Sequence, residues 1–144
     1  MKMALIMKPK TVIDTNIIVA SLSSYSEYHW VIESILNKQI DLFVTNEILL
    51  EYEEILKIKY SLGVADNFLT ALRELPNVHF VTVFFKWDLL KDADDNKFID
   101  CYVAAAAEYL VTADKGFNIL RQINFPPINV VSILSFNEII SIGI

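Results

Sequence analysis

Short apolar segments alternate along the chain with amphipathic ones, and we interpret the apolar segments as strands. They are rich in β-branched and aromatic residues, and turn residues at 76–77 and 126–127 separate several of them from their neighbours. The pattern predicts five strands, at residues 11–14, 41–44, 78–85, 109–112 and 129–133. Strands that are apolar nearly throughout are typical of a parallel sheet that is covered on both faces.

The segments between these strands place apolar residues at helical spacing. Thr45 or Asn46 can cap one helix, Gly63 is predicted to separate it from the next, and Asp94 or Asp95 can cap a third. The predicted helices cover residues 17–22, 30–36, 46–59, 65–75, 95–108, 117–122 and 136–140. Strands that alternate with helices in this way predict the α/β class with a mainly parallel sheet.

Length and composition favour a single domain with a hydrophobic core. The chain has 144 residues, of which 54% are hydrophobic, so it is too apolar for disorder. No uninterrupted apolar stretch reaches the ~18 residues of a membrane span, and the first seven residues lack the length and cleavage site of a signal peptide. We therefore expect one domain over residues 1–144, no membrane association, and an N-terminal extension at residues 1–10.

Cysteine content indicates the redox environment of the chain, and its net charge limits how it could bind nucleic acid. The single Cys101 cannot form an internal disulfide, and no Cys/His cluster predicts a zinc site, so a reduced, cytoplasmic setting is the simplest interpretation. The net charge is −6, whereas general nucleic-acid binders usually carry a basic surface. Binding of a phosphate backbone would therefore need bound cations or a local basic patch.

Two acidic residues are predicted to lie beyond the carboxyl ends of strands. Asp14 ends the first strand, and Asp114 follows the fourth strand after Thr112 and Ala113. In open α/β sheets this edge forms the crevice in which ligands bind. Each carboxylate could instead cap the helix that follows it, so the pattern leaves both roles open.

Two further acidic residues occupy helix faces that should point inward. Glu51 lies three residues after Ile48 and four before Ile55, within the apolar stripe of its helix. Asp100 faces the same way as Val103 in a helix that is apolar nearly all round. A buried carboxylate is costly unless it is paired or binds a cation. The alternatives are an edge position for Glu51 and stabilisation of Asp100 by the helix N-terminus.

Together these four acidic residues predict a metal site. Clustered carboxylates raise each other's pKa values unless cations lie between them. Ligands that are all oxygen select Mg²⁺ or Mn²⁺, and such ions can activate water and stabilise the leaving oxygen in phosphodiester hydrolysis. Asn16 and Thr112 could orient the carboxylates or a metal-bound water.

The blocks that contain these acids resemble the PIN-domain ribonucleases. The blocks are Asp14-Thr15-Asn16, the segment ILLEYEEIL around Glu51, the segment DADDNKFID that ends at Asp100, and VTADK around Asp114. In order and spacing they are most similar to the bacterial branch of toxins in toxin–antitoxin pairs, the relatives of VapC-type toxins. The resemblance covers residues 11 to about 140.

The resemblance implies a three-layer α/β/α fold with a sheet of about five strands, and cleavage of RNA that depends on Mg²⁺ or Mn²⁺. It also implies a cognate antitoxin protein as partner. Its acidic quartet, which ligates the metal and performs catalysis, would be Asp14, Glu51, Asp100 and Asp114. Its helpers would be Asn16 and Thr112.

The chain departs from the family pattern at a few positions. Ala93 and Ala113 stand where relatives often have Pro and Gly. Asp95 competes with Asp100 as the third ligand, and Asp100 is preferred because of its place on the inward helix face.

Three other functions match parts of the pattern. A phospho-accepting receiver domain uses an acidic pair near the first strand and a lone Asp after a central strand, and this sequence lacks a convincing match for either. A phosphatase with an aspartyl nucleophile would have a second Asp where Asn16 stands. The third alternative is a PIN module without catalytic activity that only binds a partner, although nothing in the sequence favours it.

A homodimer is predicted from residues 48–75, which should form a helical hairpin. This peripheral element carries many apolar groups, and exposed apolar patches usually mark an interface. The residues concerned are Leu62, Val64, Phe68, Leu69, Leu72 and Leu75. The aromatic residues of the chain are scattered, so we interpret them as core and not as a platform for stacking bases.

Overall fold

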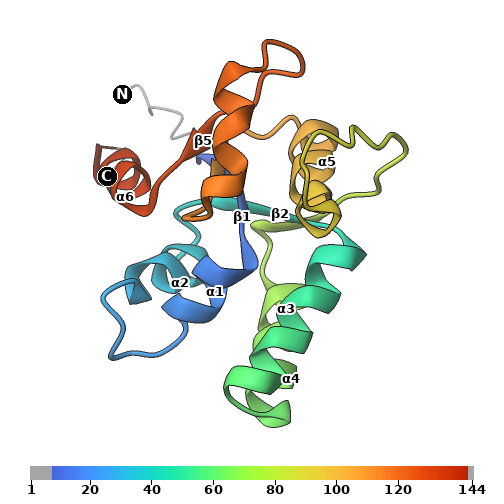
Figure 1. The fold of residues 1–144 in the computed structure, drawn as a ribbon. Helices are drawn as coiled ribbons and strands as arrows, with labels where there is room; N and C mark the ends of the chain where they lie inside the picture. The colour runs from blue at the N-terminus through green and yellow to red at the C-terminus, as the bar shows by residue number, and fades with distance from the viewer. Residues whose placement is uncertain (1–7, 143–144) are drawn as a thin grey trace.

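A computed structural model describes residues 8–142 of the chain (Figure 1). Its five strands form one sheet in the order β3-β2-β1-β4-β5, and every neighbouring pair is parallel. The strands are β1 (Lys10–Ile13), β2 (Asp41–Val44), β3 (Val78–Phe80), β4 (Tyr109–Val111) and β5 (Val130–Val131). The order reverses between β1 and β4, and in such sheets the ligand crevice opens outside the carboxyl ends of these two strands.

Helices flank the sheet, so the predicted α/β/α class is confirmed. The α-helices are α1 (Thr15–Ser21), α2 (His29–Leu36), α3 (Asn46–Lys59), α4 (Leu62–Glu74), α5 (Asn96–Ala105) and α6 (Ile133–Ile142). Two 3₁₀ segments, η1 (Ala93–Asp95) and η2 (Lys115–Gln122), precede α5 and follow β4. Helix α5 packs against β1, β2 and β4.

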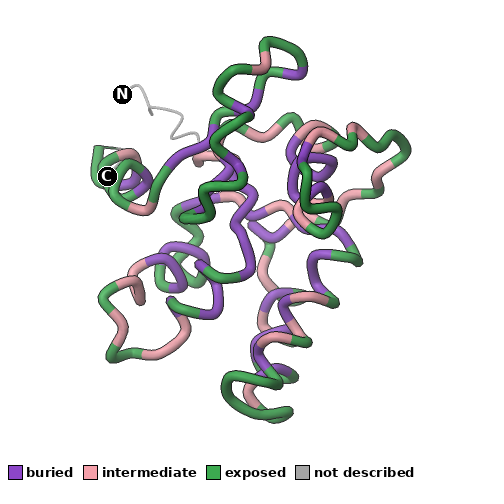
Figure 2. Tube along the Cα trace, viewed as in Figure 1, coloured by how far each residue is buried: buried purple, intermediate pink, exposed green. Residues whose placement is uncertain are grey.

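The core lies between the sheet and the inner faces of these helices. Figure 2 shows most residues of β1, β4 and β5 and one side of α3 as buried, with exposed residues along the outer side of that helix. The central strands contribute side chains that are fully buried, among them Val12, Ile13, Leu42, Leu110 and Val111. These apolar runs are the reason that the sheet could be predicted from the sequence.

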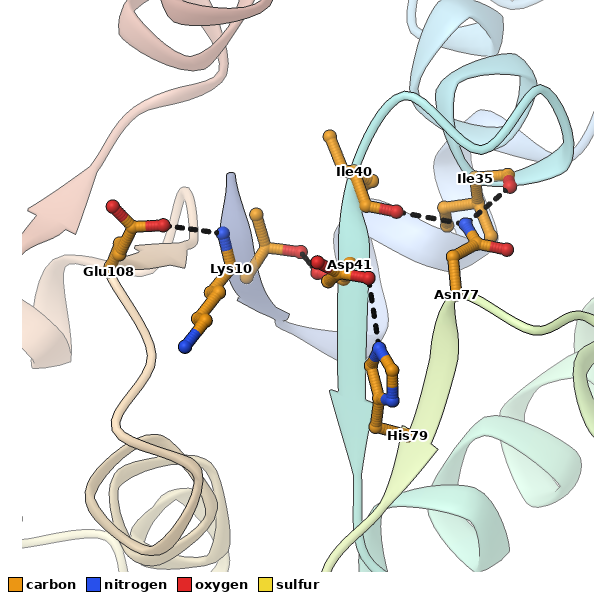
Figure 3. A network of polar contacts seen from close by, with 8 residues as sticks. Lys10, Ile35, Ile40, Asp41, Asn77, His79 and Glu108 are labelled. Carbon is orange, nitrogen blue, oxygen red and sulfur yellow. Dashed lines mark hydrogen bonds and ion pairs between the residues drawn. The ribbon is translucent and has the colours of Figure 1, made fainter. Parts of the chain in front are cut away.

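Polar contacts fix the starts of the strands relative to each other (Figure 3). The Thr11 hydroxyl donates to the Asp41 carbonyl at 2.8 Å, and an Asp41 carboxylate oxygen lies 2.9 Å from Nε2 of His79. The Asn77 amide, directly before β3, donates to the carbonyls of Ile35 and Ile40, each at 2.8 Å. The amino end of the sheet is thus closed by hydrogen bonds, while Oδ1 of Asn77 is buried without a partner within residues 8–142.

Strand β3 is shorter than the predicted strand at 78–85. It pairs only with β2, which ends at Val44, and the last contact of this ladder is Val81 N donating to Val44 O at 2.9 Å. Beyond it the chain has no strand to pair with and runs as an irregular segment, in which Phe84 and Phe85 are exposed. The expectation that the aromatic residues are core is therefore wrong for these two, and it is also wrong for the exposed Tyr25, Tyr60, Phe80 and Phe125.

Helices α3 and α4 form the predicted hairpin, but Gly63 does not separate them. Ser61 begins α4 instead, because its hydroxyl accepts a hydrogen bond from Val64 N at 3.1 Å, and Gly63 lies in the first turn. The apolar face of α4 is also less available than the dimer prediction assumed. Phe68, Leu69 and Leu72 are buried within the chain, whereas Leu62 is exposed.

Two further expectations concern the ends of the chain and membranes. Of the predicted N-terminal extension, residues 1–7 lie outside the described residues, and Lys10 already belongs to β1. None of the helices within residues 8–142 combines the length and the apolar character that crossing a membrane requires.

Candidate active site

Asp14 stands at the carboxyl end of β1 and is almost completely buried, with 5% of its surface exposed. Its backbone N–H donates to Val111 O at 3.0 Å, which extends the contact between β1 and β4. Although Asp14 occupies the N-cap position of α1, its side chain makes no capping hydrogen bond. The carboxylate accepts a hydrogen bond from the Thr112 hydroxyl at 2.9 Å instead. Helix capping therefore does not explain this buried acid.

Thr112 links Asp14 to Asp114. Its hydroxyl donates to Asp14 and accepts from the backbone N–H of Asp114 at 3.0 Å. Asp114 is exposed and does cap η2, because its Oδ1 accepts from Gly116 N at 2.8 Å. A Cβ at Gly116 would lie 3.3 Å from this oxygen, so the glycine leaves room for the carboxylate. The buried hydroxyl thus holds the ends of two neighbouring strands together.

Helix α3 brings Glu51 to the same edge. The next residue, Tyr52, is fully buried, and its hydroxyl donates to Ile13 O at 2.6 Å, which fixes α3 against the end of β1. One Glu51 carboxylate oxygen accepts a hydrogen bond from the Thr15 hydroxyl, and the other lies 2.9 Å from the Lys97 ammonium. Both oxygens of Glu51 therefore have partners, as expected for a carboxylate on an inward-facing position.

The charges of these acids act on one another. Burial raises the pKa of Asp14, the hydrogen bond from Thr112 opposes this effect, and the charges of Glu51 and Asp114 raise the pKa further. Burial and the two nearby charges both make ionisation of Asp14 less favourable than that of an aspartate in water. The structure thus brings together Asp14, Glu51 and Asp114 from three separate segments of the chain.

Asp95 belongs to this group as well. Burial raises its pKa to about 6, and the charges of Asp92, Asp114, Asp14 and Glu51 add to the shift. Asp95 precedes α5, where it was expected to cap the helix, but its side chain makes no capping hydrogen bond. Its carboxylate, like that of Asp14, is not used by the helix that follows it.

Asp100 is buried as predicted but has different neighbours. One of its carboxylate oxygens accepts a hydrogen bond from Trp87 N at 2.9 Å. Burial raises its pKa, the Trp87 N–H and the charge of Lys86 lower it, and the charges of Glu47 and Asp88 raise it. It lines a pocket next to Lys97 and Lys86, on the side of the irregular segment that follows β3. The structure therefore groups Asp95, and not Asp100, with the three other acids.

The two predicted helper residues differ in their positions. Thr112 is buried and contacts both strand-end acids, as expected. Asn16 is exposed, and within residues 8–142 its side chain makes no hydrogen bond to any of the acids. Two contacts of Glu51 were not predicted from the sequence, the hydrogen bond from Thr15 and the ion pair with Lys97. The signal for Lys97 was a lone lysine among buried positions of an apolar helix.

The group of acids fits a hard divalent cation in its donor chemistry. All the donors are carboxylate oxygens, the type that Mg²⁺ and Mn²⁺ prefer. A cation would offset the burial and the repulsion that together raise the pKa values of Asp14 and Asp95. In the part of the chain from residue 8 to 142, no three acidic, His or Cys side chains lie close enough as drawn to hold one ion. The fit therefore rests on donor type and charge.

Comparison with known proteins identifies a domain family. A family model described as PIN domain matches residues 10–116, which include all the acids discussed above. No curated protein matches the chain. The matched segment spans well over half of the chain and reaches from the start of β1 into η2.

Two solved structures share the fold at low sequence identity. One is a chain in the crystal structure of VapBC2 from Rickettsia felis bound to a DNA fragment from their promoter, with 15% identity and a TM-score of 0.58. That match covers 85% of this chain and 97% of the other. The second is the RRP44 PIN domain of T. brucei, with 11% identity, a TM-score of 0.54, and coverage of 96% and 84%.

Proposed function

The chain belongs to the PIN-domain family, and on that premise we propose that it is an endoribonuclease that hydrolyses RNA phosphodiester bonds with Mg²⁺ or Mn²⁺. One observation carries the proposal: Asp14 is buried at the carboxyl end of β1 while the charges of Glu51 and Asp114 act on it. Such repulsion lowers the stability of the fold and is expected where a cation is to be bound.

The acids have separate tasks in this proposal. Asp14, Glu51, Asp95 and Asp114 would hold the ion, which when bound supplies an activated water and neutralises charge on the phosphate. Thr112 keeps Asp14 in one orientation through its hydroxyl and ties Asp114 to it through the backbone. The Thr15 hydroxyl donates a hydrogen bond to Glu51 and keeps that carboxylate in one orientation. Asn16, being exposed at the start of α1, is left free to contact the substrate.

We assign the third ligand to Asp95, although the sequence pattern favoured Asp100. Asp100 already accepts a hydrogen bond from Trp87 N, so its carboxylate anchors the irregular segment to α5. Asn96 supports the same segment, because its side-chain oxygen accepts from Leu90 N at 2.8 Å. Asp95 has no such structural contact and lies among the other acids.

The biological role that fits best is that of a toxin restrained by a cognate antitoxin in the cytoplasm. The fold shared with a chain of the VapBC2 structure supports it, together with the sequence blocks that resemble this branch. A homodimer remains part of the proposal, with Leu50, Ile58 and Leu62 on the α3–α4 hairpin as the exposed apolar residues available for it.

The test is cleavage of a panel of structured RNAs in Mg²⁺, Mn²⁺ and EDTA by the parent protein, Asp95→Asn and Asp100→Asn. We expect metal-dependent cleavage by the parent, loss of most of it in Asp95→Asn, and retention in Asp100→Asn, whose amide oxygen can still accept from Trp87 N. The reverse result would return the third ligand to Asp100. A parent protein that binds RNA or a partner without cleaving would favour the non-catalytic PIN module, and labelling by acetyl phosphate would favour the receiver domain.

A further inference from the structure

Lys97 forms the most buried ion pair among the described residues. Its ammonium lies 2.9 Å from a Glu51 carboxylate oxygen, and the two side chains are 12% and 25% exposed. The Lys57–Glu53 pair on α3 is more open, at 41% and 30%, and the Lys86–Glu47 contact is long, at 3.9 Å. Removing charges from water costs free energy, so a buried ion pair is not explained by the solubility that surface charges provide.

The position of Lys97 in its helix strengthens this point. It is the second residue of α5, in the first turn, where the helix dipole favours negative charge and disfavours a cation. The ion pair with Glu51 opposes this effect, and the ammonium also lies 5.7 Å from the centroid of the Phe98 ring. Asp95 is two residues away, and Glu51 is in direct contact.

We propose, on the basis of the proposed nuclease function, that the Lys97 ammonium is a resident cation of the acidic site and takes the place of a second divalent ion. One carboxylate oxygen of Glu51 pairs with the Lys97 ammonium, and the other accepts a hydrogen bond from the Thr15 hydroxyl. The carboxylates of Asp14, Asp95 and Asp114 then remain as donors for one divalent ion. In this proposal the four carboxylates share one fixed cation, the Lys97 ammonium, and one exchangeable divalent ion.

The proposal predicts the number of ions that the site binds. Mn²⁺ titrations followed by the electron paramagnetic resonance signal of free Mn²⁺ should show one bound ion per parent chain and one per Lys97→Arg chain. Lys97→Met should bind two, with the first bound about tenfold or more tightly than in the parent, because a positive charge within a few ångström has been removed. Lys57→Met, which removes an equal charge elsewhere on the chain, should behave as the parent.

Melting in EDTA gives a second measurement that does not depend on cleavage. Lys97→Met should melt below the parent, since Glu51 loses its partner, and should gain more than the parent from added Mn²⁺. Where Lys97→Met fails to fold, Lys97→Gln carries the same expectations. A parent chain that binds no Mn²⁺ overturns the nuclease proposal and this inference with it. One ion in both parent and Lys97→Met, or two in both, overturns only the inference.

Discussion

Both ends of the sheet hold polar side chains that are buried or partly buried, but the contacts of these side chains differ. At the amino end, Thr11, Asp41, His79 and Asn77 form hydrogen bonds that hold neighbouring segments together (Figure 3). At the carboxyl end, the buried Asp14 carboxylate accepts a side-chain hydrogen bond from Thr112 and is repelled by the charges of Glu51 and Asp114. The polar groups at the amino end stabilise the fold through their hydrogen bonds, whereas repulsion between the acids at the carboxyl end destabilises it.

The difference shows how a site can be distinguished from a structural network when both are buried. Paired polar groups lose little when they leave water, so a network held by hydrogen bonds needs no ligand. Like charges that are brought together without enough partners destabilise the fold, and such a group persists where a ligand completes it. Substitutions at the amino end should therefore lower stability alone, and those at the carboxyl end should lower function first.

Asp14→Asn should produce the largest effect. The amide keeps the shape of the side chain but removes a charge that a divalent ion needs, so cleavage should fall by about two orders of magnitude or more. The melting temperature in EDTA should equal or exceed that of the parent, since the repulsion by Glu51 and Asp114 is relieved. Cleavage assays and melting curves with and without Mg²⁺ measure both effects.

The outcome that contradicts this prediction is specific. Full Mn²⁺-dependent cleavage by Asp14→Asn would remove Asp14 from the site. A lower melting temperature in EDTA would show that the charge of Asp14 stabilises the fold.

Two threonines sharpen the comparison, because each is buried and each donates one hydrogen bond at its end of the sheet. Thr112→Val should lower cleavage or Mn²⁺ affinity by about 10- to 100-fold, since Asp14 loses the group that orients it. Thr11→Val should leave both unchanged and lower the free energy of unfolding by about 1 kcal/mol. Denaturant unfolding and cleavage assays on both variants separate the two roles.

Equal losses of cleavage in the two valine variants would mean that the effect comes from general loosening of the sheet. Thr112→Ser, which retains the hydroxyl, should restore most of the lost cleavage and so serves as the control at the carboxyl end.

The strand pattern and most of the site could be predicted from the sequence because both depend on local composition. The apolar strands gave the sheet, with β2 predicted at its observed bounds, 41–44. Asp14, Glu51 and Asp114 could be selected because each breaks an apolar pattern or ends a strand. The shortening of β3 could not be predicted, since it depends on where its neighbour β2 ends.

The choice between Asp95 and Asp100 shows where the sequence is not sufficient. Both lie near the start of α5, and periodicity correctly places Asp100 on a buried face. What periodicity cannot show is that Trp87 N, from a segment without regular structure, already satisfies Asp100. The ion pair of Lys97 with Glu51 is a contact between distant segments and is equally invisible in a linear pattern.

A third prediction concerns Asn77, at the amino end. Asn77→Ala removes two hydrogen bonds to the carbonyls of Ile35 and Ile40 and should lower the free energy of unfolding by about 2 kcal/mol. The stabilisation by saturating Mg²⁺ should stay as in the parent, because the substituted residue lies at the far end of the sheet. Denaturant unfolding with and without Mg²⁺ tests this, and a reduced response to Mg²⁺ would show that the two ends are coupled.

The smallest expected effect is the pH dependence contributed by Asp95. Its pKa rises from the ordinary 3.8 to about 6 in the fold, chiefly through burial. A raised pKa means that the fold binds this proton more tightly than the unfolded chain does. The contribution to stability is therefore greatest below about pH 4, declines as the pH rises toward 6, and stays low above it. Because Asp95 is partly exposed, we expect a loss of about 1 kcal/mol or less between these limits.

Melting curves of metal-free protein at pH 4.5 and pH 7 should show a smaller difference for Asp95→Asn than for the parent, whereas Asp66→Asn, an exposed change on α4, should reproduce the parent. Mg²⁺ at pH 7 should recover the lost stability in the parent and less of it in Asp95→Asn. Identical pH responses in the parent and Asp95→Asn would show that Asp95 titrates as an ordinary surface acid, which would leave the carboxyl end with three interacting carboxylates.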